Sequence, residues 1–453
     1  MVNYDELQVD NNHTTDGVNV GEFLEGLEGK RRANLGLVPT DDAGVKAMLR
    51  HIGEPVTRFG ESAGDRRTRL LGLIAERNIE VSALADNDVE MDGGEEADGD
   101  DVPDEEFYTP ASEELVEARR FIARDALGRS QIRLDALRLQ GEVPFEEVLL
   151  GRRSQNELCK RYGLVGSQLI STRPVSMVAI SPLDSDRVLT GSWGGDVKLL
   201  NGELDVLKTF DTTASLGKVG GLAWSPVDES IFACTGANVQ LWNAESTEAP
   251  LMELTNHTNR VVRCQFHPSG RFIASASFDM TWRLWDINTQ QELLLQEGHS
   301  KEVYTVRFHP DGSLLASAGL DGVSLVWDLR LGQMIMPLKG HIKPIYGLDW
   351  SANGVNVATS SADGSIKVWD LRMQRELETI AAHSKVVSDV KFHKNQLISS
   401  SYDNTLKIFS CDNWLPLTTL EGHSEKVMSF DVCDDYILST GWDRSAKKWV
   451  VDG

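Results

Sequence analysis

Three columns of residues recur at a near-constant interval through the C-terminal part of this chain. The histidine column steps by 40 to 42 residues and consists of His257, His299, His341, His383 and His423. An aspartate follows each histidine by 20 or 22 residues: Asp279, Asp321, Asp363, Asp403 and Asp443. The aromatic column that runs alongside consists of Trp242, Trp285, Trp327, Trp369, Phe409 and Trp449. A period of this length predicts a repeat architecture in which each repeat is one small supersecondary unit.

The three columns resemble the WD40 family, whose repeats of about 40–45 residues each supply one four-stranded propeller blade. The resemblance implies that the histidine and aspartate of a repeat are hydrogen-bonded, and that a hydroxyl and the tryptophan complete a buried chain. We expect Ser317, Ser360 and Ser400 to supply that hydroxyl. Because a satisfied polar network fixes loop geometry, we interpret these histidines as structural rather than catalytic.

The repeats predict a seven-bladed, all-β propeller. The expected blades are residues 174–212, 217–256, 260–296, 302–338, 344–380, 386–420 and 427–450. The first is degenerate, with Gly194 at the aspartate position and Leu200 at the tryptophan position. The last stops after its third strand, and an open strand edge invites aggregation. We therefore expect Val165–Thr172 to supply the missing strand and to close a domain spanning residues 165–453.

One face of this propeller is expected to bind a partner. The residue before each turn aspartate should lie at the mouth of the ring, where the chain places Trp193, Phe278, Tyr402 and Trp442. The loops that enter the blades carry cations: Arg260, Lys301, Lys343, Lys385 and Lys426. Clustered exposed aromatics mark interfaces, and aromatics interleaved with cations suit an acidic protein or RNA. The alternative is that several of these rings fold back onto neighbouring blades.

The N-terminal region divides by composition into four segments. We expect a disordered extension at 1–37, two short helices at 38–79, an acidic linker at 80–106 and a helical segment at 107–164. Between Asp86 and Glu106 the linker holds 12 acidic residues and no basic one. Such a charge run is typical of a solvated spacer. In the helical segment, Ser112 is the expected N-cap of its first helix.

The stretch "VKAMLRHIGEPVTRFGE" places Val45, Met48, Leu49 and Ile52 on one face of a helix. Gly53 and Pro55 end that helix. Because helices of about 12 residues are marginal alone in water, we expect this face and Phe59 to dock on a partner protein. The alternatives are that this face packs on the propeller of the same chain or on a helix at 111–139.

Composition excludes several classes of function. The net charge of -24 argues against nucleic-acid binding over the whole surface. No apolar run is long enough to span a membrane. The five cysteines form no CxxC pair, and the chain carries no phosphate loop, nucleophile elbow or zinc motif. We expect no enzyme activity, no cofactor, no metal and no small-molecule substrate.

The segment "PTDDAGVKAMLRHIGEPVTRFGESAGDRRTRLL" resembles the splicing factor motif. Beside WD repeats, this motif resembles the pre-mRNA processing factor four family of U4/U6 small nuclear ribonucleoprotein subunits. The chain differs from the family in its acidic linker and its short N-terminal extension. The resemblance implies a nuclear, non-catalytic scaffold whose partners are pre-mRNA processing factor three, a nuclear cyclophilin, and the U4 and U6 RNAs. Arg66 and Arg67 open the second helix of the motif and are expected to pair with acidic groups or RNA phosphate.

A second hypothesis rests on a repeated tetrapeptide. "WDLR" occurs at Trp327–Arg330 and again at Trp369–Arg372. This resembles the WDxR signature of substrate receptors for cullin-4 ubiquitin ligases. Co-purification with small nuclear RNA, rather than with a ligase adaptor, would separate the two hypotheses.

Overall fold

The computed structural model describes residues 42–52, 54, 56, 63–77, 112–213, 215–246 and 249–451. They fall into two compact units, divided between Phe107 and Tyr108. The expected extension at 1–37, the acidic linker at 80–106 and Phe59 lie outside the described residues.

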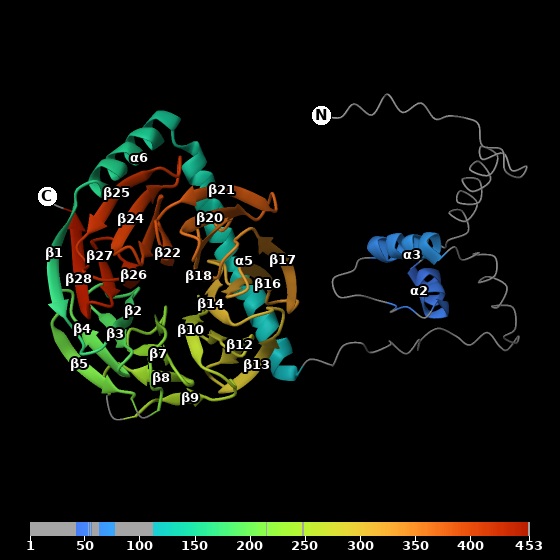
Figure 1. The fold of residues 1–453 in the computed structure, drawn as a ribbon, viewed down its shortest axis with the longest axis horizontal. Helices are drawn as coiled ribbons and strands as arrows, with labels where there is room; N and C mark the ends of the chain where they lie inside the picture. Colours follow the sequence, from blue (N-terminus) through green and yellow to red (C-terminus); the bar gives the residue numbers. More distant parts are fainter. Residues whose placement is uncertain are drawn as a thin grey trace, which may run out of the picture. The chain divides into compact units, whose positions relative to one another are not determined.

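The second unit is a seven-bladed β-propeller, which confirms the predicted fold class (Figure 1). Each blade is a four-stranded antiparallel sheet. Blade 1 contains β2 (Val175–Ile180), β3 (Val188–Ser192), β4 (Asp196–Leu200) and β5 (Val206–Asp211). Blade 2 contains β6 (Leu222–Trp224), β7 (Ile231–Thr235), β8 (Val239–Asn243) and β9 (Met252–Leu254). Blade 3 contains β10 (Val261–Phe266), β11 (Phe272–Ser277), β12 (Trp282–Asp286) and β13 (Gln291–Gln296).

The remaining four blades follow in chain order. Blade 4 contains β14 (Val303–Phe308), β15 (Leu314–Gly319), β16 (Val323–Asp328) and β17 (Gln333–Lys339). Blade 5 contains β18 (Ile345–Trp350), β19 (Asn356–Ser361), β20 (Ser365–Asp370) and β21 (Arg375–Ala381). Blade 6 contains β22 (Val387–His393), β23 (Gln396–Ser401), β24 (Thr405–Ser410) and β25 (Pro416–Glu421). Blade 7 contains β26 (Val427–Val432), β27 (Tyr436–Gly441), β28 (Ser445–Val451) and β1 (Tyr162–Leu169).

Blade 7 is closed by a strand from the other end of the domain. Strand β1 pairs antiparallel with β28, from Tyr162 opposite Val451 to Leu169 opposite Ser445. The sequence predicted this closure, but the strand begins three residues earlier than Val165 and ends at Leu169. It starts there because the preceding helix ends at Cys159, whose side chain is buried in the core between blades 6 and 7.

The inner three strands of a blade differ from the outer one in their pattern of burial. In blade 3, every residue of β11 and β12 is buried, whereas the outer strand β13 is half-exposed. Inner strands are covered on both faces by neighbouring blades, which favours continuous apolar runs such as "WRLWD". The outer strands meet solvent on one side and therefore alternate.

The two ends of the blades carry different connections. The turn between the second and third strands lies at the same end as the loop that enters the blade, and we call this end the His–Asp rim. The turns between the first and second strands, and between the third and fourth, form the opposite rim. On the His–Asp rim, the residue after the turn aspartate is left-handed, with φ of 76° at Gly322 and 67° at Met280. Glycine adopts this conformation freely, whereas methionine is strained there.

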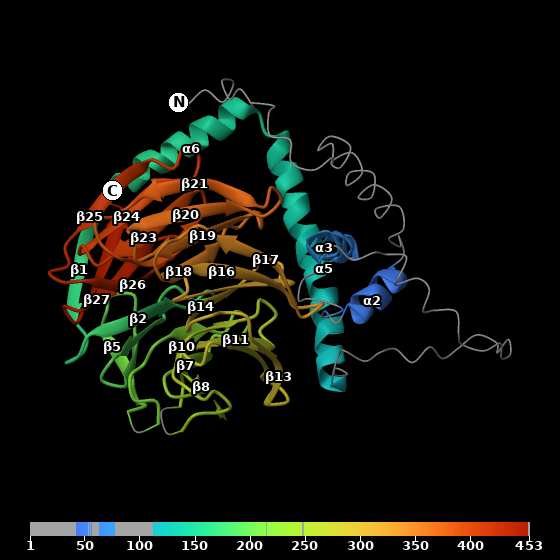
Figure 2. The same cartoon turned by 45° about the vertical axis from the view of Figure 1, so that its right-hand side comes forward.

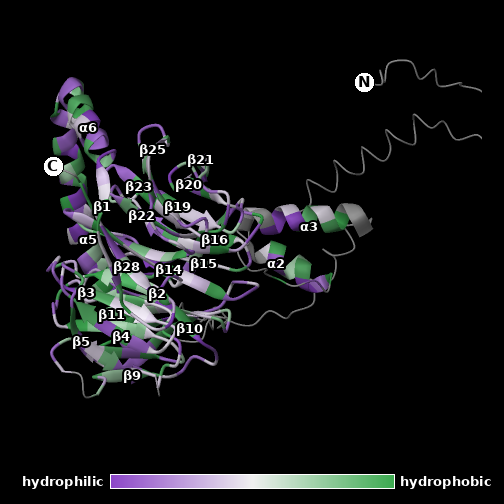
Figure 3. Cartoon of the chain, turned by 60° about the vertical axis from the view of Figure 1, so that its left-hand side comes forward, coloured by the Kyte–Doolittle hydropathy of each residue, from purple (hydrophilic) through white to green (hydrophobic). Residues whose placement is uncertain are grey.

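Two helices precede β1 and lie against the propeller. Helix α5 (Glu113–Glu142) begins at Ser112, whose hydroxyl accepts a hydrogen bond from the Leu115 amide. Its buried residues Leu115, Ala118 and Ile122 join the core of blades 3 and 4. Figure 2 shows α5 along one side of the ring, with α6 (Phe145–Cys159) leading back from its end. Figure 3 shows the mixture of apolar and polar residues along α6.

Arginines of α5 hold the opposite rim of three consecutive blades. Arg129 donates to the Pro268 carbonyl at 3.0 Å in blade 3. Arg133 forms a two-point ion pair with Asp311 of blade 4, at 2.9 and 2.7 Å, and donates to the Asn353 carbonyl of blade 5 at 2.7 Å. A bidentate arginine–carboxylate pair fixes geometry as well as adding energy. Helix α5 therefore braces the opposite rim, and these arginine contacts do not involve the His–Asp rim.

Within the described residues, the first unit contains two helices, α2 (Asp42–His51) and α3 (Ala63–Arg77). Val45 and Leu49 of α2 form a small core with Leu70 and Ile74 of α3. The expectation that this face packs on a partner, on the propeller or on the 111–139 helix is therefore revised. The second helix of the same motif covers Val45 and Leu49, because Leu70 and Ile74 lie one turn apart and present their own apolar stripe.

Candidate interaction surface

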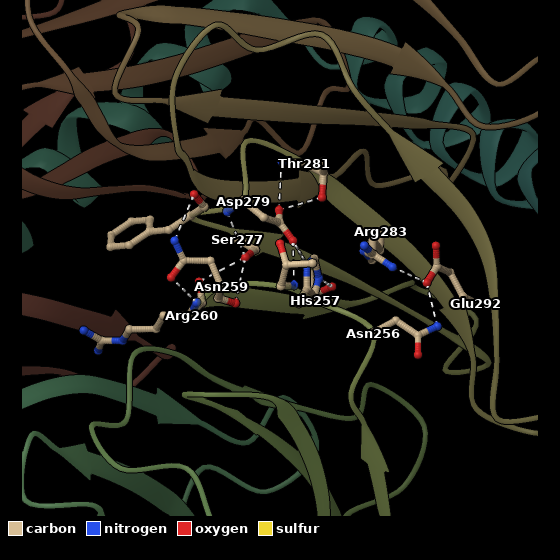
Figure 4. A network of polar contacts seen from close by, with 12 residues as sticks. Asn256, His257, Asn259, Arg260, Ser277, Asp279, Thr281, Arg283 and Glu292 are labelled. Atoms are coloured by element: carbon tan, nitrogen blue, oxygen red, sulfur yellow. Dashed lines mark hydrogen bonds and ion pairs between the residues drawn. The ribbon is translucent and has the colours of Figure 1, made fainter.

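The recurring histidine, aspartate and tryptophan columns meet in a hydrogen-bonded chain that holds the His–Asp rim of each regular blade. In blade 3, the Trp285 indole donates to the Ser275 hydroxyl at 2.8 Å, and His257 lies between that hydroxyl and Asp279, 2.7 Å from each. Figure 4 shows the His257–Asp279 pair of this chain, with Asp279 also bonded to Thr281. The same chain recurs in blades 4, 5 and 7 through His299, His341 and His423. In blade 6 the chain lacks its indole, because Phe409 stands at that position.

The direction of this chain follows from its members. An indole N–H can only donate, so the Ser275 hydroxyl accepts from Trp285 and donates its own proton to Nε2 of His257. The remaining proton of the neutral histidine is then on Nδ1 and is donated to Asp279. Burial lowers the pKa of His257, which favours this neutral form. Burial alone would raise the pKa of Asp279, but hydrogen bonds from Thr281 and His257 outweigh it and keep the pKa below its ordinary value.

The predicted hydroxyl positions are correct in one blade and wrong in two. Ser317 takes this role in blade 4, as expected. In blade 5 the hydroxyl is that of Thr359, and in blade 6 that of Ser399. Ser360 and Ser400 are each one residue further along, so their side chains point to the other face of the strand. Ser360 finds no hydrogen-bond partner there within the described residues.

The four predicted aromatics are half-buried on the His–Asp rim. Trp193 and Trp442 pack edge to face, with ring centroids 5.5 Å apart and an interplanar angle of 72°. The Lys426 ammonium lies 4.7 Å from the ring centroid of Trp442 and 5.1 Å from that of Tyr402. These rings are thus partly packed on their neighbours, as the alternative interpretation had it, and they also keep accessible surface. Phe278 is half-buried as well, at the corresponding turn of blade 3.

Every blade contributes a cation to this rim, just before its first strand. The predicted members are joined by two more in blades 1 and 2, giving Arg173, Lys218, Arg260, Lys301, Lys343, Lys385 and Lys426. Six are exposed and Arg260 is half-buried. Arg260 extends away from the His257–Asp279 pair (Figure 4). Lys218 could have been found from the sequence, because it lies 42 residues before Arg260. We refer to these seven residues as the cation ring.

Two hollows open between neighbouring blades on the same rim. One, of about 420 Å³, is lined by residues that include Lys218 and Arg260. The other, of about 460 Å³, lies between blades 5, 6 and 7. Its lining residues include Lys343, Lys385, Lys426 and Tyr402. Burial raises the pKa of the Tyr402 hydroxyl, so this group stays protonated and can donate a hydrogen bond. Both hollows therefore have lysine or arginine side chains in their lining.

The two predicted WDxR arginines lie on the opposite rim. Arg330 pairs with Asp328 of its own turn, with Nη2 and Oδ2 2.8 Å apart. Arg372 pairs with Asp370 at 3.4 Å and has 74% of its side chain exposed.

Within the described parts of the chain, no group of His, Cys, Asp and Glu residues could hold a metal ion. No described helix is long and apolar enough to cross a membrane.

In the helix pair, the structure separates the predicted docking residues into two groups. Val45 and Leu49 are 1% and 0% exposed, and Arg66 is also buried. Met48, Ile52 and Arg67 are half-buried and keep accessible surface. The first group therefore holds α2 against α3, and only the second is available to a partner.

Sequence comparison connects both units to known families. Five repeats match the WD domain, G-beta repeat family, at residues 248–286, 290–328, 332–370, 374–410 and 414–449. Residues 45–73, which include most of both helices of the first unit, match the family described as pre-mRNA processing factor 4 (PRP4) like. The chain contains WD40 repeats and a PRP4-like motif. Sequence analysis predicted this combination, and it is confirmed.

Several curated proteins are similar to this WD40-repeat protein. It is 39% identical to the U4/U6 small nuclear ribonucleoprotein PRP4 of Saccharomyces cerevisiae, over 65% of this chain and 64% of the relative. It is 36% identical to a PRP4-like protein of Arabidopsis thaliana, over 49% of this chain and 41% of that protein. It is 38% identical to human U4/U6 small nuclear ribonucleoprotein Prp4, over 39% of this chain and 33% of that protein. The chain thus spans less than two thirds of the length of each of these relatives.

Proposed function

We propose that this protein is a WD-repeat subunit of the U4/U6 small nuclear ribonucleoprotein and acts in the nucleus in pre-mRNA splicing. The observation that carries the proposal is the PRP4-like motif at 45–73 in the same chain as the WD40 repeats. The similarity to yeast PRP4 over 65% of the chain supports it. The repeats alone would not, because propellers serve many unrelated functions.

The subunit acts as a non-catalytic scaffold that holds protein partners beside the base-paired U4 and U6 RNAs. The histidines of the propeller support this role, because the side chain of each regular one is at most 1% exposed and so lies out of reach of a substrate. The aromatics and cations of the His–Asp rim provide the partner surface. Pre-mRNA processing factor three is the protein partner that we propose for this subunit within the U4/U6 particle.

The helix pair at 42–77 serves as a separate docking unit for a cyclophilin-type protein. Val45 and Leu49 form its small core, and the accessible Met48 and Ile52 supply the apolar contact. Arg67 lies half-buried on α3 and provides a cation to the same unit. Two short helices with so small a core gain stability when a partner covers them, because burial in the pair alone is limited.

Affinity purification of the full tagged chain from nuclei tests the proposal. We expect U4 and U6 RNA to be enriched over U1 RNA, and pre-mRNA processing factor three to be present by mass spectrometry. The double variant Tyr402→Ala, Trp442→Ala should reduce this enrichment without unfolding the propeller, since truncated interface aromatics cost about 2 kcal/mol or more. Recovery of a cullin-4 adaptor without U4 and U6 RNA would overturn the proposal and favour a ubiquitin-ligase receptor.

A further inference from the structure

The cation ring is unusual because none of its charges is paired with a carboxylate of a described residue, although the whole chain has a net charge of -24. Lys426 and Lys218 lie over aromatic rings, and Arg260 donates to the Lys218 carbonyl at 3.4 Å. On the opposite rim, by contrast, arginines are neutralised by neighbouring carboxylates, as Arg330 is by Asp328. Seven cations therefore surround one opening, whereas the turn aspartates of the same rim are already held by histidines. A surface of this kind is complementary to an anionic ligand.

The aromatic rings of the same rim narrow the class of that ligand. Bases of a nucleic acid bind by stacking on open aromatic faces. Here Lys426 already covers Tyr402 and Trp442, and Lys218 lies 5.7 Å from the ring centroid of Trp193. Trp193 and Trp442 are also packed on each other. Because these faces are occupied, the surface offers charge and hydrogen-bond donors but little stacking, which suits carboxylates better than bases.

The hollow between blades 5, 6 and 7 provides the binding geometry. Lys343 and Lys385 line it from successive blades, and both are exposed and unpaired within the described residues. Val386 and Tyr402 give the same hollow an apolar wall. The one carboxylate in the lining, Asp363, is already held by His341 and Ser365.

We propose that this hollow binds an acidic segment of a partner protein, with Asp or Glu side chains on the lysines and an apolar side chain against Val386 and Tyr402. This inference rests on the proposed function and deepens it, because it states the chemistry of one partner of the scaffold. The remaining members of the cation ring extend the same positive surface toward blades 1 to 4 and accept further acidic residues of the segment.

Fluorescence anisotropy with the full chain tests this proposal. The probe is a fluorescein-labelled peptide of glutamate and aspartate with a central leucine. The comparison probes are the same peptide with amides in place of acids, and an oligouridylate of equal charge. We expect the acidic peptide to bind, the amide peptide not to bind, and the oligouridylate to bind more weakly. Salt should weaken the acidic peptide's binding, because exposed charges are screened.

Matched variants locate the site. Lys343→Gln with Lys385→Gln should weaken peptide binding about tenfold, because two exposed ion pairs with the peptide are lost. The control, Arg372→Gln with Lys394→Gln, removes the same charge from the opposite rim of the same two blades and should change binding by less than about twofold. Unchanged melting temperatures would exclude unfolding in both pairs.

Three results would overturn the inference: equal weakening by both pairs, no weakening by the first, or tighter binding of the oligouridylate. The last would favour RNA as the ligand of this rim. These outcomes are independent of the proposed function, because enrichment of U4 and U6 RNA with the unaltered chain is measured separately. Loss of that enrichment with intact peptide binding would instead overturn the proposed function alone.

Discussion

Two adjacent hydroxyls in blade 5 provide a direct test of the Trp–hydroxyl–His–Asp chain. Thr359 and Ser360 are both fully buried on β19. Thr359 accepts from the Trp369 indole at 2.9 Å and lies 2.9 Å from Nε2 of His341, whereas Ser360 has no partner among the described residues. The variant Thr359→Val keeps the size and shape of the side chain and removes only its hydroxyl. It leaves one buried donor and one buried acceptor unsatisfied at once.

The cost follows from those two groups. A buried polar group left without a partner costs about 1–3 kcal/mol, so Thr359→Val should lower the free energy of unfolding by about 3 kcal/mol. Ser360→Ala removes a hydroxyl that satisfies nothing, and we expect a change within about 0.5 kcal/mol. Thr359→Ser retains the hydroxyl and should recover most of the loss.

Urea unfolding of the full chain, followed by tryptophan fluorescence, measures these differences. All 11 tryptophans lie between Trp193 and Trp449, so the signal reports the propeller and not the helix pair. Equal destabilisation by Thr359→Val and Ser360→Ala would refute the reasoning, because it would show that packing rather than the polar chain determines the cost. A larger loss of stability for Ser360→Ala would show that Ser360, the residue expected from the sequence, supplies the hydroxyl of the chain.

Three further predictions concern acid stability, the helix pair and ring closure. Burial lowers the pKa of His267 to about 4; the unfolded chain binds this proton near pH 6.5, so the free energy of unfolding should fall by about 3 kcal/mol between pH 6.5 and 4, and His267→Gln should flatten that slope in urea titrations. Leu49→Asp places a charge in the small core of α2 and α3 and should expose 42–77 to protease without changing the melting temperature of the propeller, whereas Thr68→Asp, at an exposed site, should do neither. A chain that begins at Arg173 should melt lower than one that begins at Lys160, because it lacks β1; equal melting temperatures would show that β28 needs no partner.

The spacing of the repeats was enough to predict the propeller, the number of its blades and the source of its closing strand. It was not enough to choose between neighbouring hydroxyls. Strand β15 reads "LLASAG" and offers only Ser317, whereas β19 reads "NVATSS" and β23 reads "QLISSS". Because successive side chains of a strand point to opposite faces, a shift of one residue reverses the assignment.

The packing of α3 on the apolar face of α2 was not predicted, for a different reason. The sequence has an apolar stripe on each side of the Gly53–Pro55 break. The arginines at the start of α3, however, favour the interpretation of α3 as a polar helix that binds anionic groups. Whether two short stripes meet each other or a partner depends on the turn between them, and local periodicity does not specify that turn.

The cation of blade 2 was missed because that blade lacks the histidine and aspartate that would have set its register.

The closing strand also has a consequence for how the domain forms. Lys447 of β28 donates to Ser167 of β1, a residue 280 positions away in the chain. Joining ends so far apart costs about 5 kcal/mol in loop entropy, whereas each blade between them assembles from residues close in sequence. Six complete blades can therefore fold before β1 arrives, leaving β28 with an unpaired edge. That open arc is the species on which a chaperone would act, and slow docking of β1 would set the rate at which stable protein accumulates.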